Sequence, residues 1–222
     1  MMANPPYQQA VRLHTSVLAG AERRLLVWMA TRLPAAINSD HLTTVATVAM
    51  VGVGACFWMG GRALPFAIVL LAVNWFGDSL DGTMARVRRQ ERPRYGYYVD
   101  HVLDAVGFAA LIGGLALGGH MSGAIALGFL SAYFLLLLEI ALAAHARGTF
   151  RLAFWHIGPT ELRILLCVGV LQLMRSQTVT LFGHRWLLFD AGCTAGIAAL
   201  SITFVVSALH NGAALYQEER LS

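Results

Sequence analysis

Six long apolar segments separated by short polar ones run through the chain and predict six membrane-spanning helices. A helix needs about 20 mostly apolar residues to cross a bilayer. With its polar extension the segment that starts at 63 reaches this length, and only the segment at 162–174 falls well short of it. The predicted fold class is an all-α integral membrane protein. The expected spans are 41–59, 63–77 with a polar extension through Arg86, 99–117, 124–144, 162–174 and 189–209.

A shorter amphipathic stretch precedes the first span. Its apolar residues recur at helical spacing beside a basic side, which is typical of a helix that lies on the membrane surface. Pro34 ends this helix, and polar residues at 38–40 can cap the next one. We expect a cytoplasmic leader at 1–40 and a six-helix transmembrane domain at 41–222. The residues of the two sides are Leu25, Trp28, Met29 and Leu33, and Arg23, Arg24 and Arg32.

The composition supports a membrane protein and argues against a separate soluble domain. Of 222 residues, 57% are apolar and 13% are charged, whereas soluble domains carry about 25% charged residues. The net charge of +4 comes from arginine alone, because the chain has no lysine. In a membrane protein this excess concerns orientation and anionic lipid, so we expect no nucleic-acid partner. Cys56, Cys167 and Cys193 are widely separated and show no metal or disulfide spacing.

The arginines are distributed unevenly between the two sides of the predicted bundle. With the N-terminus inside, only Arg62, Arg175 and Arg185 of the 16 fall on the outer side. Because cytoplasmic loops carry the excess of basic residues, both termini and the loop between the second and third spans are predicted to be cytoplasmic. The expected location is a bacterial inner or plasma membrane, with several passes.

Four of the six aspartates fall where the second span ends and the third begins. Asp78 and Asp81 are three residues apart, and Asp100 and Asp104 are four apart, so each pair lies on one face of its helix. Carboxylates near hydrocarbon are costly and indicate function. An antiparallel turn between the helices is expected to bring the four together.

Four converging carboxylates require cations. Oxygen-only ligands suit Mg²⁺ or Mn²⁺ and not zinc, and two ions about 3.5–4 Å apart could polarise a phosphoryl group. Gly82 and Ala85 leave room for a diphosphate near the helix backbone, and Arg86 can donate two hydrogen bonds to phosphate. Gly96 is expected to open the next helix at a close crossing. These residues together predict a substrate with a diphosphate.

The segment resembles the signature of the CDP-alcohol phosphatidyltransferase family, Asp-x2-Asp-Gly-x2-Ala-Arg followed by Gly-x3-Asp-x3-Asp. All eight fixed positions are filled between Asp78 and Asp104. The resemblance implies a six-helix fold, with 41–222 as the catalytic domain. It also implies a cytoplasm-facing cavity in which a CDP-linked alcohol is cleaved and CMP is released. It further implies that Asp78, Asp81, Asp100 and Asp104 bind two metal ions, and that Asp104 is the general base.

Several polar residues outside the signature have more than one interpretation each. His101, beside Asp100, contacts either the acceptor alcohol or a carboxylate next to the metal ligands, or it lies at the membrane interface. Glu161 and Arg163, at the start of the fifth span, either recognise the acceptor or cap that span. Glu139 lies within the fourth span and either lines the cavity or pairs with Arg163 or His145, pairing being favoured.

The resemblance implies a phospholipid-synthesising phosphotransferase with CDP-diacylglycerol as the default donor. The sequence lacks the Asp-Pro of glycerol-phosphate-using relatives and the lysine of inositol-phosphate enzymes, so the acceptor stays open. The main alternative is transfer from a CDP-aminoalcohol to diacylglycerol. An intramembrane prenyltransferase and a small cation carrier are remote alternatives. Membrane lipid and the nucleotide substrate are the expected partners, and homodimerisation stays open.

Overall fold

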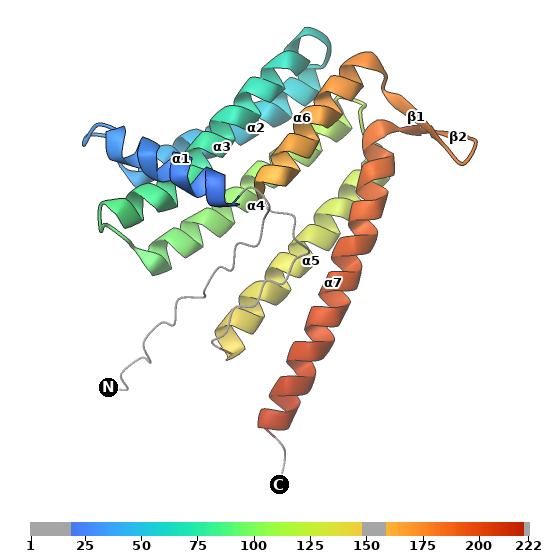
Figure 1. Cartoon of the computed structure of the whole chain (residues 1–222). Helices are drawn as coiled ribbons and strands as arrows, with labels where there is room; N and C mark the ends of the chain where they lie inside the picture. Colours follow the sequence, from blue (N-terminus) through green and yellow to red (C-terminus); the bar gives the residue numbers. More distant parts are fainter. Residues whose placement is uncertain (1–18, 148–158, 220–222) are drawn as a thin grey trace.

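The computed structural model describes residues 19–147 and 159–219 and is dominated by helices (Figure 1). Parts of the predicted leader and some of the counted arginines, such as Arg12 and Arg151, lie outside these residues. The helices are α1 (Ala19–Arg32), α2 (Ser39–Met59), α3 (Leu64–Val87), α4 (Pro93–Leu117), α5 (Gly123–Arg147), α6 (Pro159–Arg175) and α7 (Leu188–Glu218); a short 3-10 turn, η1 (Gly61–Ala63), precedes α3.

Five of these helices are long and apolar enough to cross a membrane, namely α2, α3 with its preceding turn, α4, α5 and α7. Many large apolar side chains on them face outward, including Val48, Phe66 and Ile202, each more than 60% exposed. Such an apolar exterior fits lipid rather than water. The protein is therefore an all-α membrane protein.

The predicted span at 162–174, the fifth along the chain, is not confirmed as a span. It corresponds to α6, which has 17 residues and therefore extends only about 26 Å at 1.5 Å per residue. The surface placement of the N-terminal helix is also not confirmed. α1 packs against α3 through Leu26 and Ala30, which are buried with Leu80 and Met84, while Leu25 and Trp28 on its outer side are about half exposed.

Local sequence explains where the helices begin and where they touch. The Asn38 side chain accepts a hydrogen bond from the His41 N–H and caps α2, as the sequence predicts. Glycine then allows two close backbone approaches. Gly77 of α3 lies against the Leu42 carbonyl of α2, and Gly54 of α2 lies against Gly114 of α4. The main core forms around these crossings, with Phe57, Leu71, Leu115, Val170 and Phe189 buried within it.

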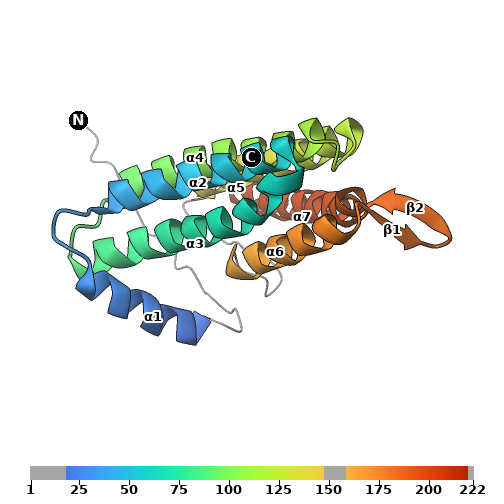
Figure 2. The ribbon, with the colours of Figure 1, turned by 90° about the horizontal axis from the view of Figure 1, so that it is seen from above.

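α5 and α7 pair along the other side of the molecule (Figures 1 and 2). Glu139, 9% exposed, joins them, because its two oxygens accept hydrogen bonds from Ser207 at 2.8 Å and Asn211 at 2.7 Å. Arg147 donates to the Asn211 side-chain oxygen. Glu139 thus has the structural pairing that the sequence favoured, but the predicted partners Arg163 and His145 were wrong.

A two-stranded hairpin between α6 and α7 was not predicted. Its strands are β1 (Thr178–Leu181) and β2 (His184–Leu187), paired antiparallel. The β-branched and aromatic residues of this segment favour strands, although its place between two predicted spans had suggested only a loop.

Candidate active site

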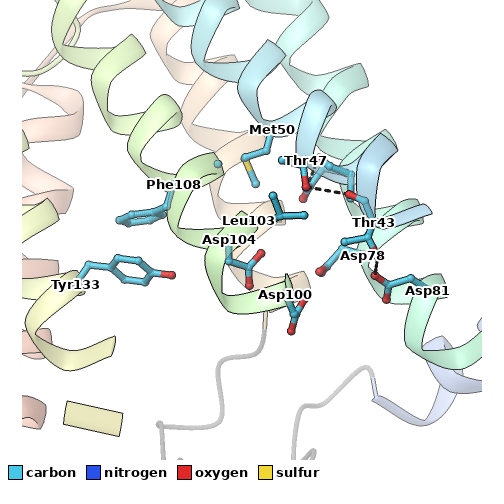
Figure 3. Close-up of a pocket in the computed structure, with 13 residues that line it drawn as sticks. Thr43, Thr47, Met50, Asp78, Asp81, Asp100, Leu103, Asp104, Phe108 and Tyr133 are labelled. Atoms are coloured by element: carbon cyan, nitrogen blue, oxygen red, sulfur yellow. Dashed lines mark hydrogen bonds between the residues drawn. The ribbon is translucent and has the colours of Figure 1, made fainter. Parts of the chain in front are cut away.

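A polar pocket opens between α2, α3, α4 and α5 (Figure 3). It is lined by all four signature aspartates, together with Thr43, Asn74 and Tyr133. Asp78 and Asp81 reach it from the second half of α3, and Asp100 and Asp104 from the first half of α4. The α3–α4 hairpin therefore brings both pairs to one pocket.

Three of the carboxylates converge closely. One oxygen of each of Asp78, Asp100 and Asp104 lies within 4.8 Å of the others. Asp78 and Asp100 are half-buried, whereas Asp104 is exposed. Three like charges at this separation repel one another strongly unless cations neutralise them.

Asp81 lies in the same pocket but outside this group of three. Its Oδ2 accepts a hydrogen bond of 2.6 Å from the Thr43 hydroxyl of α2, and its Oδ1 accepts from the Gly82 N–H. Figure 3 shows the Asp81 carboxylate turned toward Thr43. The expected convergence of four carboxylates is therefore a convergence of three, with the fourth held beside them. Thr43 follows the polar residues at the start of α2, and this position in the sequence is the signal that could have identified it.

Arg163 of α6 forms an ion pair with Asp78, at 2.6 Å between Nη2 and Oδ2. Its Nε donates to the Asn74 side-chain oxygen at 2.7 Å. Asn74 is 5% exposed and also donates to the Ala46 carbonyl of α2. This chain of contacts joins α6, α3 and α2 at the pocket wall. Asn74 lies one helical turn before Asp78, and its position in an apolar run was the signal that could have identified it.

The residues predicted to contact the diphosphate do not line the pocket. Gly82, Ala85 and Arg86 continue α3 toward its end, and the exposed Arg86 donates from Nη2 to the Thr83 hydroxyl at 3.1 Å. Gly96 was expected at a close crossing, and this was wrong. Apart from its chain neighbours and the adjoining backbone of α4, no described residue has an atom within 4 Å of the position that a Cβ at Gly96 would take.

None of the three acceptor candidates lines the pocket itself, and Arg163 touches its wall only through Asp78 and Asn74. The His101 ring stacks on Tyr97, with centroids 4.1 Å apart, and its Nδ1 lies 2.9 Å from the Tyr97 carbonyl oxygen. Glu161 is half-buried at the start of α6. Tyr133 was not singled out from the sequence, yet it reaches the pocket from α5 with its hydroxyl pointing toward Asp104 (Figure 3).

Glu22 links α1 to α3 and α6. Its Oε1 accepts hydrogen bonds from the Trp75 indole at 2.9 Å, the Ser79 hydroxyl at 3.5 Å and the Thr160 hydroxyl at 2.7 Å. Trp75 and Ser79 flank Asp78 on α3, and Thr160 lies one turn before Arg163 on α6. The two helices that carry the Asp78–Arg163 pair are thus also joined through α1.

The donor atoms around the pocket fit a hard divalent cation. The close group of three offers only carboxylate oxygens, which Mg²⁺ and Mn²⁺ prefer, and no sulfur or imidazole ligand. Asp78, Asp100 and Asp104 could therefore hold a metal ion. The same carboxylates can also accept protons from a bound hydroxyl group.

Comparison with known protein families gives one clear assignment. A family model described as CDP-alcohol phosphatidyltransferase matches residues 37–209, which is more than three quarters of the chain. The match includes α2 to α6 and most of α7, and therefore the whole pocket. The comparison with curated proteins gave no match.

Proposed function

The chain belongs to the CDP-alcohol phosphatidyltransferase family, and we propose that it moves a substituted phosphate from CDP-diacylglycerol to a hydroxyl acceptor, releasing CMP. The family makes the protein a phosphotransferase that acts on a CDP-alcohol. The convergence of Asp78, Asp100 and Asp104 supports the proposal most directly. These three carboxylates occupy three of the eight signature positions.

Asp104 is the proposed general base. It is the exposed member of the group of three, so an entering hydroxyl can approach it from the pocket. Its carboxylate takes the proton of that hydroxyl as the oxygen attacks phosphorus, a role usually worth about 10²–10⁴ in rate. The nearby Tyr133 hydroxyl can orient the same carboxylate or the acceptor.

All four carboxylates, Asp104 included, would hold the metal ions in this proposal. Asp78, Asp100 and Asp104 would bind one Mg²⁺ or Mn²⁺, and Asp81, oriented by Thr43, would complete a site for a second. When bound, the ions neutralise the carboxylates and stabilise the charge on the diphosphate. Thr43 keeps the Asp81 carboxylate in a single orientation.

Substrate binding uses residues on both sides of the carboxylates. The small residues Gly82 and Ala85 let the donor diphosphate approach the α3 backbone, and Arg86 donates hydrogen bonds to it. Gly96 is proposed to leave room for the diphosphate beside α4. Arg163 is the best supported acceptor contact, because its Nη1 is buried without a hydrogen-bond partner among the described residues. His101 and Glu161 are secondary candidates.

The proposed topology places the pocket and both termini in the cytoplasm. It requires α6 to be a sixth span. Thr160 near its start contacts Glu22, while Gln177 just beyond its end lies 3.5 Å from His120 in the α4–α5 loop. The two ends of α6 therefore lie at opposite ends of the bundle, which supports a crossing. Single cysteines placed at Arg89 and at His120, labelled with an impermeant thiol reagent from outside intact cells, test this topology. Labelling at Arg89 alone would contradict it.

A product assay tests the proposed activity. Purified protein is given Mg²⁺ or Mn²⁺, CDP-diacylglycerol or CDP-aminoalcohols, and a panel of hydroxyl acceptors, with CMP and lipid products identified by mass spectrometry. We expect metal-dependent CMP release that Asp104→Asn abolishes and Glu139→Gln preserves. Products formed only from a CDP-aminoalcohol and diacylglycerol would reverse the donor assignment, and metal-independent CMP release would refute the mechanism.

A further inference from the structure

The β1–β2 hairpin projects sideways beyond the helices at the end of the bundle opposite the pocket. Both ribbon views show it extending past α6 and α7 (Figures 1 and 2). The Leu188 N–H donates to the Gln177 carbonyl, and the Asp190 carboxylate accepts from the Ser122 N–H. These contacts fix the base of the hairpin to the bundle. Because the surrounding helices cross a membrane, a sideways projection at their ends lies over lipid.

The pairing register separates the hairpin into two chemically different faces. Val179 pairs with Trp186, and Leu181 pairs with His184, so these side chains share one face. Leu181 and Trp186 on it are 43% and 42% exposed. The opposite face carries Thr178, Thr180, Arg185 and, at the base of the hairpin, the half-buried Leu187. Arg185 donates to the Thr178 hydroxyl. One face is therefore mostly apolar and partly uncovered by the described chain, and the other is polar apart from Leu187 at its base.

Phe182 occupies the tip of the hairpin and is 99% exposed. It has a φ of 50°, and Gly183 after it has a φ of 79°. Two-residue turns with two positive φ angles strongly favour Asn-Gly, and a left-handed conformation costs an ordinary residue about 1–2 kcal/mol. A fully exposed phenylalanine in this conformation gains nothing from folding alone. No described residue covers its ring, so an apolar contact for Phe182 would come from the surroundings of the bundle.

The charges near the hairpin favour a lipid surface as that contact. Residues 176–189 contain no acidic residue and include Arg185 and His184. Basic residues beside exposed Trp and Phe are characteristic of membrane-interface anchors. We propose that the hairpin lies in the headgroup region of the leaflet opposite the pocket, with Leu181, Phe182 and Trp186 against the acyl chains and Arg185 toward anionic headgroups. This inference does not depend on the proposed donor or acceptor.

Two adjacent positions test the orientation of the hairpin. Single cysteines replace Leu181 or Thr180 in a chain whose three native cysteines are changed to alanine, and each carries an environment-sensitive fluorophore. The protein is reconstituted into phosphatidylethanolamine–phosphatidylglycerol vesicles. We expect the Leu181 label to be blue-shifted, quenched by brominated lipid and shielded from aqueous iodide, and the Thr180 label to behave oppositely.

Equal iodide quenching at both positions would overturn the proposal. Shielding at Leu181 that disappears when the protein is diluted in lipid would also overturn it, because a second copy of the chain would then cover the apolar face. Shielding that is constant over the dilution series supports the lipid assignment.

Phe182→Asn separates a lipid contact from a structural role. Asparagine suits the turn better, so strand pairing, followed by amide hydrogen exchange, should be kept or strengthened. The Leu181 label should nevertheless become several-fold more accessible to iodide. Phe182→Trp is the matched control and should keep the shielding. Unchanged shielding in Phe182→Asn, with the hairpin intact, would remove Phe182 from the anchor.

Discussion

Two groups of polar side chains lie inside the helical bundle, one around Glu139 and one around Asp104, and they differ in how their charges are balanced. Glu139 is a single acid whose two oxygens accept hydrogen bonds from Ser207 and Asn211 of the facing helix. Asp104 lies with two other carboxylates within 4.8 Å and is exposed to a pocket. Glu139 holds two helices together, whereas Asp104 faces space that a substrate can enter.

The comparison shows that an acid within a membrane-spanning helix is not by itself a sign of catalysis. Intramembrane acids are costly, but neutral hydrogen-bond donors can offset that cost locally, as at Glu139. Repulsion between several carboxylates cannot be offset in this way and requires cations. Convergence of like charges therefore distinguishes the functional group from the structural one.

The largest effect is expected for Asp104→Asn compared with Glu139→Gln. Asparagine keeps the shape of the Asp104 side chain but cannot accept a proton, so turnover should fall by about 10²–10⁴. Glu139→Gln keeps hydrogen-bonding oxygen and should change turnover little. The measurement is turnover and donor affinity at saturating metal. If donor affinity falls as far as turnover in Asp104→Asn, the residue is chiefly a metal ligand.

Removal of a carboxylate from the pocket should next affect metal dependence. Asp78→Asn, Asp81→Asn and Asp100→Asn each remove one charged ligand and should raise the metal concentration needed for half-maximal activity. Thr43→Val leaves Asp81 in place but frees its orientation, and a shift of about tenfold is expected. Thr44→Val is the matched control, because the exposed Thr44 hydroxyl donates to the Asp40 carbonyl of its own helix and to no pocket residue among those described. Unchanged metal titrations in all three Asp variants would refute the two-metal assignment.

A moderate effect on stability, not on chemistry, is expected at Glu139. Glu139→Ala leaves Ser207 and Asn211 without their acceptor, and hydrogen bonds between membrane helices are worth about 1 kcal/mol. The free energy of unfolding in mixed micelles should fall by about that amount, with turnover per folded molecule unchanged. A selective loss of turnover would place Glu139 in the functional group and end the distinction.

The smallest effect is expected at Glu22, which lies outside both groups. Glu22→Ala removes the acceptor for Trp75, Ser79 and Thr160. The contact of α1 with α3 and α6 should loosen, so the backbone amides near these three residues should exchange hydrogen faster. Because the site is half exposed, the loss of stability should stay below about 1 kcal/mol. Arg24→Ala, on the exposed side of the same helix, is the control. Equal exchange in both variants would show that Glu22 does not fasten α1.

The sequence could identify the spans and the acidic signature, because both depend on local patterns. Hydrophobic runs define helices, and spacings of three and four define faces, so the positions of Asp78 and Asp100 followed directly. The partners of these residues could not be obtained that way. Arg163 is 85 residues from Asp78, and only the packing of α6 against α3 brings them together. The position of Gly96 was misjudged for the same reason, since a glycine marks a close approach only where another helix is near.

The ion pair between Arg163 and Asp78 has a consequence for the biogenesis of the protein. If the nascent chain enters the membrane and folds before it binds ions, three ionised carboxylates would carry a charge of −3 during that interval. The guanidinium reduces this to −2 with a cation that the polypeptide itself supplies, from α6, which packs against α3 and follows it in the chain. Insertion, helix packing and ion loading can therefore follow one another, and the chain need not find its ions in order to fold.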